Sequence, residues 1–349
     1  MDSMRRNLLQ WYDRNARDLP WRRTRDPYAI WVSETMLQQT RVETVIPYFQ
    51  RFLERFPTVQ ALARAHEDAV LSQWSGLGYY RRARLLHAGA REVVSRYGGR
   101  VPEDLDARQS LPGVGRYTAG AIGSIAFDKA EPVVDGNVTR VLARVFGIET
   151  PVGTAQTTKR LWAEAAKLVP GERPGAFNQA LMELGATVCA PQRPRCERCP
   201  LASDCQALAR GNVEALPVAR ARKAPVPVDL VAVVATQGRG AERSVWLVRG
   251  QERLFGGLWG VPTAERRGSG IGDARTALRS ARMSARVAPE PTAQLEHVLT
   301  HRRLRLDVFR AVGVRAEESE TRRRFTRPDL ERVGISSLTR RLLEVSLDC

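Results

Sequence analysis

The chain has 349 residues, of which 55 are lysine or arginine and 38 aspartate or glutamate, so its formal net charge is +17. This length allows two or three domains with cores of their own. The charge predicts a polyanionic partner, with nucleic acid as the first candidate. The absence of a long apolar run and of a signal-peptide pattern argues against a membrane or secreted protein. We therefore expect a soluble, cytoplasmic protein, associated with the nucleoid if its source is bacterial.

Residues 4–189 show the three- and four-residue apolar spacing of helices, for example at Leu85, Leu86, Ala90 and Val93. Proline and glycine breaks divide this region into roughly eight to ten helices, with no strand. We predict a mainly α domain over residues 1–210.

The first candidate for chemistry is Glu34, which lies in the otherwise apolar segment between Pro20 and Thr40. A carboxyl group beside an apolar surface has a raised pKa, because burial disfavours its charged form. Such a group can donate a proton near neutral pH. The alternative is an ordinary polar position on a helix surface.

The segment Gly76–Arg84 (GLGYYRRAR) begins with a Gly-x-Gly turn, and two tyrosines and three arginines come after this turn. An exposed aromatic ring can insert between bases while neighbouring arginines bind phosphates. A tyrosine that packs into the core is the structural alternative.

A Pro-Gly-x-Gly turn opens the segment Leu111–Asn137, and a single acid, Asp135, closes it. We expect Gly113 and Gly115 to adopt left-handed backbone angles in a tight turn between two helices. The free N–H groups at the start of the second helix would then suit a phosphate oxygen. Asp135 precedes another amphipathic run as an N-cap would. A simple turn and a simple cap are the alternatives.

Four of the five cysteines fall within seventeen residues, with the spacing C-x6-C-x2-C-x5-C. In a reducing compartment this crowding indicates a metal site rather than disulfides, and four thiolates suit either zinc or an iron–sulfur cluster. Cys349 is expected to be a free terminal thiol. The four candidate ligands are Cys189, Cys196, Cys199 and Cys205.

Residues 216–228 contain three prolines and three basic residues without an acid, and we predict an extended linker over residues 211–228. Beyond it, residues 230–234, 244–248 and 304–312 predict strands, and residues 272–283 and 330–347 predict helices. We predict an α+β domain over residues 229–349.

Five motifs, in order, together resemble the MutY group of adenine DNA glycosylases: LPWR, SETMLQQT, GLGYYRRA, LPGVGRYTA and DGNVTRV. This group belongs to the endonuclease III-like part of the helix-hairpin-helix, Gly-Pro-Asp superfamily. The resemblance implies a mainly α fold, namely a helix-hairpin-helix glycosylase domain with an iron–sulfur loop, followed by an α+β Nudix-like domain. It also implies a monomeric, monofunctional glycosylase that hydrolyses adenine mispaired with 8-oxoguanine or guanine in double-stranded DNA.

The resemblance assigns catalytic roles to two carboxyl groups, as in glycoside hydrolysis. Glu34 would protonate the flipped adenine and assist the incoming water. Ionised Asp135 would stabilise the positively charged sugar or bond to it transiently, with Tyr117 and Asn137 assisting. The residues that would enclose or hydrogen-bond the base are Trp21, Arg22, Leu37, Gln39 and Glu183. Those that would contact DNA are Gln38, Thr40, Tyr79, Gly113 and Gly115.

The resemblance also extends to the cysteines and, more weakly, to the C-terminal domain. The cysteine spacing coincides with the [4Fe–4S] loop of endonuclease III and MutY. In the C-terminal domain, LFGGLWGVP marks the Nudix-like region, whose candidate helix has too few acids to bind magnesium for hydrolysis. The family reads 8-oxoguanine with Phe-Ser-His, where this chain has Leu299, Thr300 and His301. Thr300 can replace the serine hydroxyl, whereas Leu299 cannot stack as phenylalanine does.

Two rival functions remain open from the sequence. Related glycosylases that also cut the strand carry a lysine two residues beyond the last glycine of the hairpin, where this chain has Tyr117. An endonuclease III-like glycosylase/lyase for oxidised pyrimidines is therefore disfavoured. A non-catalytic, DNA-binding iron–sulfur redox sensor is disfavoured because Glu34 and Asp135 are both present.

Overall fold

A computed structural model describes residues 2–219, 224–238, 240–250 and 255–347. The chain divides into two compact units that are not the two halves of the sequence. We call the described part of residues 1–64 and 85–221 the helical unit, and that of residues 65–84 and 222–349 the sheet unit. Residues 65–84 were predicted to belong to the first domain, whereas they group with the second unit. Cys349, Lys223 and part of the predicted linker lie outside the described residues.

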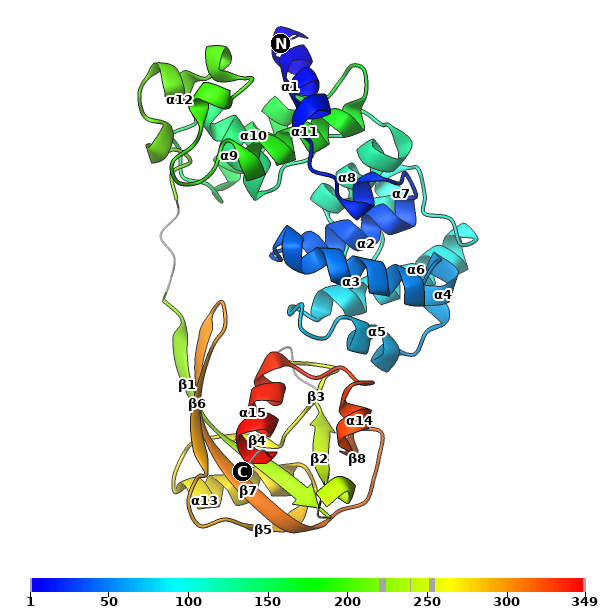
Figure 1. The fold of residues 1–349 in the computed structure, drawn as a ribbon, viewed down its shortest axis with the longest axis vertical. Coiled ribbons are helices and arrows are strands. Elements are labelled where there is room, and N and C mark those ends of the chain that lie inside the picture. Colours follow the sequence, from blue (N-terminus) through cyan, green and yellow to red (C-terminus); the bar gives the residue numbers. More distant parts are fainter. Residues whose placement is uncertain (1, 220–223, 239, 251–254, 348–349) are drawn as a thin grey trace. The chain divides into compact units, whose positions relative to one another are not determined.

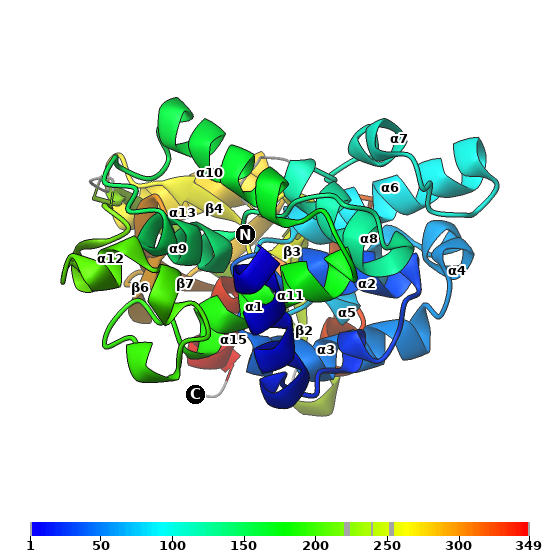
Figure 2. The same cartoon turned by 90° about the horizontal axis from the view of Figure 1, so that it is seen from above.

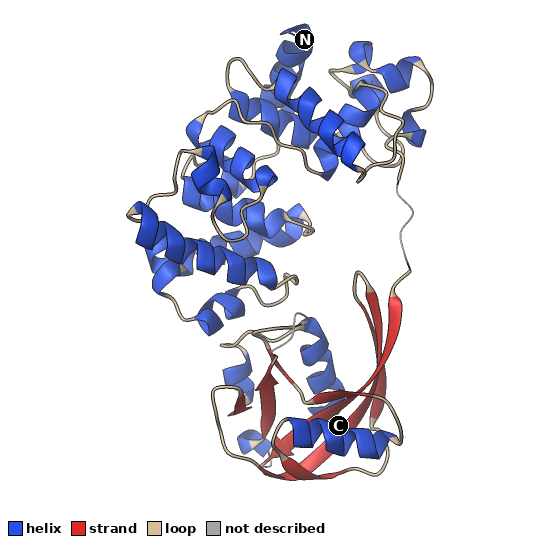
Figure 3. Cartoon of the chain, turned by 180° about the vertical axis from the view of Figure 1, so that it is seen from behind, coloured by secondary structure: helices blue, strands red, loops and turns tan. Residues whose placement is uncertain are grey.

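Every strand of the described residues belongs to the sheet unit, as Figure 3 shows. The helical unit begins with α1 (Asp2–Asn15), the short 3-10 turn η1 (Pro20–Arg22), α2 (Pro27–Leu37), α3 (Val42–Arg55) and α4 (Val59–Arg64). It continues with most of α6 (Arg81–Tyr97), and then α7 (Leu105–Gln109), α8 (Arg116–Phe127), α9 (Gly136–Val145), α10 (Ala155–Leu168), α11 (Pro174–Thr187) and α12 (Gln206–Ala209). The tracing of these elements can be followed in Figure 1.

Residues 2–189 contain eleven α-helices, more than the predicted eight to ten. The difference comes from short helices such as α4, α5 (Glu67–Gln73) and α7, which hold too few residues to show a helical period. Two of them begin at a side-chain cap, since His66 accepts a hydrogen bond from Asp68 N and Asp104 accepts one from Ala107 N.

The core of the helical unit brings together helices far apart in the sequence. Leu8 of α1, Val141 of α9 and Phe177 of α11 belong to one buried cluster, and Figures 1 and 2 both show α1 beside α11. Close approach of α11 to the start of α9 requires Gly185, because a Cβ there would lie 2.7 Å from the Cβ of Asn137. This packing fixes the end of α9 that carries Asp135.

The sheet unit contains one mixed sheet with the central order β3-β2-β1-β7-β5. Its strands are β1 (Val226–Gln237), β2 (Ser244–Arg249), β3 (Trp259–Gly260), β4 (Thr263–Glu265), β5 (Ser284–Val287), β6 (Ala293–Val298), β7 (Arg302–Arg315) and β8 (Arg322–Phe325). The central strands β1 and β7 run parallel, while β6 pairs antiparallel with β7. The other helices are α13 (Gly270–Ser280), α14 (Arg327–Leu330) and α15 (Ser337–Leu347).

Helices cover both faces of the sheet. Val231 and Val233 of β1 pack with α13, and Ala232 and Val234 pack with the cluster that contains Leu342 of α15. Because both faces are buried, β1 reads as a continuous apolar run rather than an alternating one. The C-terminal region is therefore an α/β sheet domain.

Two predicted boundaries differ from the structure. Strand β1 begins at Val226, inside the predicted linker, because it pairs with β7 from Val226 onward. The predicted helix over residues 330–347 begins only at Ser337, as α15, because Gly334 accepts a backbone hydrogen bond from Trp259 and Ser336 caps α15 through Thr339 N.

Among the described residues, no helix combines the length and the apolar composition needed to cross a bilayer.

Candidate active site

Glu34 lies near the C-terminal end of α2, a helix that is buried along nearly its whole length. Its side chain belongs to a residue only 4% exposed, and the Tyr117 hydroxyl of α8 donates a hydrogen bond of 2.5 Å to Oε2. Burial raises the pKa of Glu34 to about 7, an effect that the Tyr117 hydrogen bond opposes and the nearby Asp135 charge reinforces. Near neutral pH this carboxyl group can therefore hold or release a proton.

Asp135 is the N-cap of α9, as its position in the sequence predicts. Its Oδ1 accepts a hydrogen bond of 2.7 Å from Val138 N, and its Oδ2 accepts one of 3.0 Å from the Asn137 side chain. Burial raises the pKa of Asp135 from its usual value, whereas these hydrogen bonds and the charge of Arg140 act in the opposite direction. The two carboxyl groups are thus placed in different surroundings.

Arg140 connects this end of α9 to the cysteine segment. Its Nη2 donates to Asn137 Oδ1 at 2.9 Å and to Gly185 O at 2.7 Å, and its Nε donates to Cys189 O at 2.7 Å. Asn137 is held by these contacts with its amide nitrogen directed to Asp135. The sequence reasoning did not single out Arg140, although it lies one helical turn after Asn137.

One pocket of about 490 Å³ in the helical unit brings together most of the predicted site residues. Those that line it are Trp21, Arg22, Glu34, Leu37, Gln38, Gln39, Thr40, Tyr117, Asp135, Asn137 and Glu183. The sequence reasoning missed four further polar or sulfur-containing side chains in its wall, which are Arg17, Ser33, Gln179 and Met182. Gln179 and Met182 lie one helical turn or less from Glu183 on α11, a spacing that could have suggested them.

The Glu183 carboxylate is engaged by two arginines of the N-terminal segment. Arg17 Nε lies 2.7 Å from Oε1, and Arg22 Nη2 lies 2.7 Å from Oε2. Although burial raises the pKa of Glu183, the hydrogen bonds from Arg17 and Arg22 outweigh it and lower that pKa below its usual value. Glu183 therefore orients these guanidinium groups at the pocket wall, and its contact with the base stays a prediction.

The hairpin glycines lie outside the pocket. Gly113 has φ +77°, and a Cβ there would lie 2.7 Å from the Cβ of Leu85. Gly115, at φ −86°, is the N-cap of α8. The expectation of left-handed angles was thus correct for Gly113 and wrong for Gly115. A Cβ at Gly115 would meet no atom within 4 Å, so this N-cap position faces open space.

The predicted lesion-reading residues lie in the sheet unit, at the turn between β6 and β7. Leu299 is packed partly against the core, and its N–H donates to Arg302 O at 2.7 Å. Thr300 and His301 are exposed. The hydroxyls of Thr300 and Tyr79 lie 3.0 Å apart in this unit. Tyr80 is half-buried, and its hydroxyl donates to Ile335 O.

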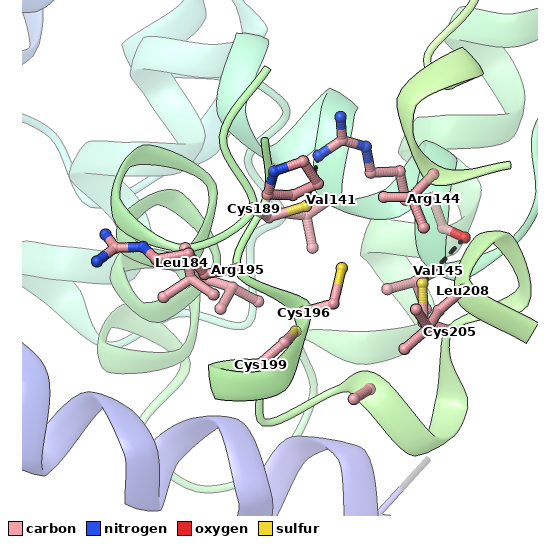
Figure 4. A pocket seen from close by; sticks show the side chains of 14 residues that line it. Val141, Arg144, Val145, Leu184, Cys189, Arg195, Cys196, Cys199, Cys205 and Leu208 are labelled. Carbon is pink, nitrogen blue, oxygen red and sulfur yellow. Dashed lines mark hydrogen bonds between the residues drawn. The ribbon is translucent and has the colours of Figure 1, made fainter. Parts of the chain in front are cut away.

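The four clustered cysteines line one small cavity, as Figure 4 shows. Its walls include the apolar side chains of Val141, Val145 and Leu184. The buried Arg144 guanidinium donates to Cys189 Sγ at 3.2 Å, and burial raises the pKa of the Cys199 thiol to about 11. Within the described ranges, no three potential ligand side chains stand close enough together to hold a metal ion.

The chain is similar in sequence to proteins of the family that its motifs indicate. A sequence model of the HhH-GPD superfamily of base excision DNA repair proteins matches residues 32–167. The chain is 54% identical over 227 residues to the adenine DNA glycosylase of Rattus norvegicus. This match covers 62% of this chain and 44% of the rat protein. It is 41% identical over 298 residues to the adenine DNA glycosylase of Arabidopsis thaliana, and this match covers 74% of this chain and 47% of the plant protein. The chain thus spans about half the length of these curated relatives.

Two solved structures each resemble 60% of the chain. A thermostable thymine-DNA glycosylase is 33% identical, with a TM-score of 0.54 and coverage of 60% of this chain and 98% of that one. A trapped endonuclease III–DNA covalent intermediate, at 23% identity, a TM-score of 0.51 and coverage of 60% and 97%, shows a common fold.

Proposed function

Because this chain belongs to the HhH-GPD superfamily of base excision DNA repair proteins, we propose that it is a monofunctional adenine DNA glycosylase. Its substrate would be double-stranded DNA in which adenine lies opposite 8-oxoguanine or guanine. The observation that carries the proposal is the buried Glu34 carboxyl, with a pKa of about 7, in one pocket with the capped carboxylate of Asp135.

The reaction breaks the bond between C1′ of the sugar and N9 of adenine, and its electron pair passes into the base. Protonated Glu34 would give its proton to N7, so that adenine leaves as a neutral molecule. Water would then add to C1′, and its proton would return to the Glu34 carboxylate. A carboxyl group whose pKa lies near the working pH can perform both transfers.

Asp135 would act as the negative charge that stabilises the cationic sugar. The hydrogen bonds from Val138 N and Asn137 favour its ionised form, and Arg140 keeps Asn137 in place for this purpose. The two carboxyl groups thus divide the work, since burial favours the proton on Glu34 while hydrogen bonds favour the charge on Asp135.

The rest of the pocket would enclose the extruded adenine. Trp21 and Leu37 offer apolar surface, and Gln39 and Gln179 offer amide groups that can both donate to and accept from the edge of a base. The two arginines held by Glu183 leave this wall with a net positive charge. In the hairpin, the open space at Gly115 would admit a phosphate to the N-terminus of α8.

We further propose that Cys189, Cys196, Cys199 and Cys205 hold a [4Fe–4S] cluster. The donor set fits, because four thiols surround one cavity and the Arg144 guanidinium supplies a positive charge beside them. When bound, the cluster would cross-link the loop that follows α11. Anaerobic preparation and metal analysis test this assignment: about four irons per chain are expected, and zinc without iron would refute it.

The sheet unit would read the base opposite adenine. We propose that it is a Nudix-like binding domain without hydrolase activity, since α13 carries a single acid, Asp273. Thr300 and His301 would face 8-oxoguanine, and the exposed ring of Tyr79 would insert beside it.

Single-turnover excision on matched duplexes tests the whole proposal. Adenine would be placed opposite 8-oxoguanine, guanine or thymine, and products would be read with and without alkali. We expect the fastest release opposite 8-oxoguanine, with strand breaks only after alkali. Equal rates opposite 8-oxoguanine and guanine would remove the role of Thr300 and His301, and no adenine release would refute the function.

A further inference from the structure

The loop that carries Tyr79 is held in an unusual backbone conformation. Gly76 and Gly78 have φ values of +105° and +71°, and Tyr79 itself has φ +48°, in the region that residues with a side chain rarely adopt. The Tyr79 residue is nevertheless 49% exposed. An exposed tyrosine on a strained backbone needs neighbours that keep it in place.

Arg82, in the first turn of α6, supplies such contacts. The centre of its guanidinium group lies 5.4 Å from the ring centroid of Trp74 and 5.5 Å from that of Tyr79. Its Nη2 donates to Gly78 O at 3.1 Å and to Leu77 O at 3.4 Å. The Trp74 indole N–H also donates to Gly78 O, at 3.2 Å. The Trp74 indole, the Arg82 guanidinium and the turn at Gly78 therefore contact one another, and the guanidinium also contacts the Tyr79 ring.

The burial of Arg82 distinguishes it from its neighbours. Arg82 is only 9% exposed, and burial lowers its pKa to about 10, whereas Arg81 and Arg84 are exposed. An arginine that binds a DNA phosphate has to present its guanidinium to solvent. The exposed Arg81 meets this condition, and Arg82 does not.

We propose that Arg82 is a positioning residue, which holds the Tyr79 ring ready to insert into the base stack and does not contact DNA itself. This inference rests on the proposed function, in which Tyr79 inserts beside the base opposite adenine. Ordering the ring before binding reduces the entropy lost on insertion. A planar guanidinium can stack flat on an aromatic face, which a lysine ammonium cannot do.

The first experiment is a double-mutant cycle between Arg82→Lys and Tyr79→Leu. Binding to a duplex with 8-oxoguanine opposite an uncleavable adenine analogue is measured for each variant, with thermal melting as the check on folding. We expect Arg82→Lys to weaken binding by about tenfold in the wild-type background, and to have no further effect when Tyr79 is already leucine.

The cycle separates the two possible failures. If Tyr79→Leu alone leaves binding unchanged, the insertion role in the proposed function is wrong. If Tyr79→Leu weakens binding and Arg82→Lys adds its full effect to it, the positioning role is wrong. If Arg82→Lys does not fold, Trp74→Phe replaces it in the same cycle, since it keeps an aromatic ring and removes the indole hydrogen bond to Gly78 O.

The second experiment compares Arg82→Met with Arg81→Met, each of which removes one positive charge. The logarithm of the binding constant falls linearly with the logarithm of salt concentration, with a slope that reports the number of phosphate contacts. We expect Arg81→Met to reduce this slope by about one and Arg82→Met to leave it unchanged. A reduced slope for Arg82→Met would make Arg82 a phosphate contact and overturn the proposal.

Discussion

Glu34 and Asp135 line the same pocket, yet different groups act on the two carboxyls. Burial dominates at Glu34, which accepts one hydrogen bond, from Tyr117. Asp135 is also buried, but it accepts hydrogen bonds from a backbone N–H and from an amide side chain. Burial raises the pKa of both groups, and because hydrogen bonds to a carboxylate favour its charged form, Asp135 has more contacts that oppose this rise than Glu34 has.

The raised pKa of Glu34 predicts the pH dependence of base release. Only the protonated carboxyl can act as the acid, so the single-turnover rate should be high below pH 7. It should fall by about tenfold for each pH unit above that. Duplex binding over the same pH range is the control. A rate independent of pH between 6 and 9 would show that Glu34 is not the proton donor.

Tyr117→Phe should move this pH dependence in a defined direction. The Tyr117 hydroxyl stabilises the Glu34 carboxylate and so lowers its pKa, while burial of Glu34 is unaffected by the substitution. The pKa of Glu34 should therefore rise, and the fall in rate should begin at a higher pH than in the wild type. The full pH–rate profile of both proteins is the measurement. A fall that begins at the same or a lower pH would contradict the assigned contact.

At the level of elements, the N-cap of α9 has a structural role in addition to the catalytic role that we propose for it. Asp135 caps the helix through Val138 N, and Arg140 and Arg144 on the same helix contact Cys189. The start of α9 is also packed closely against α11 at Gly185. Movement of this helix would therefore change the carboxylate and the cysteine loop together.

Two substitutions at Asp135 separate the cap from the charge. Asparagine keeps an oxygen that can accept from Val138 N, whereas alanine does not, and both remove the charge. We expect Asp135→Asn and Asp135→Ala each to abolish base release. Asp135→Ala should be less stable to unfolding than Asp135→Asn by about 1 kcal/mol. Denaturant unfolding and single-turnover excision measure the two effects, and substantial activity in Asp135→Asn would refute the need for the charge.

At the level of the whole molecule, the net charge bears on DNA binding, and the positions of the lysines bear on strand cleavage. The net charge of +17 rests mostly on arginine, since the chain has four lysines, Lys129, Lys159, Lys167 and Lys223. Arginine binds phosphates through a planar fork but does not form a Schiff base. Lys129, the nearest of them in sequence to the hairpin, lies 3.6 Å from Glu103 and is absent from the pocket lining.

Borohydride trapping should therefore give no covalent protein–DNA adduct under conditions that release adenine. Replacing Tyr117 by lysine supplies an amine in the pocket and is the positive comparison, in which some trapping is expected. Strong trapping by the wild-type protein would indicate a lyase, and Lys→Ala substitutions would then identify the amine.

The sequence by itself determined what depends on residues close together in the chain. The cap at Asp135, the turn at Gly113, the strands β2 and β7 and the spacing of the four cysteines were all readable, because neighbouring residues decide local backbone geometry. The motifs were enough to indicate the family, and the residues they contain line one pocket.

Only the tertiary structure decided what depends on residues far apart. The burial that raises the pKa of Glu34 comes from packing around α2, and its hydrogen bond comes from Tyr117, 83 positions away. Glu183 is paired with arginines more than 160 positions away, and residues 65–84 group with strands that begin at Val226. Desolvation and charge pairing act through space, so no local pattern could have shown them.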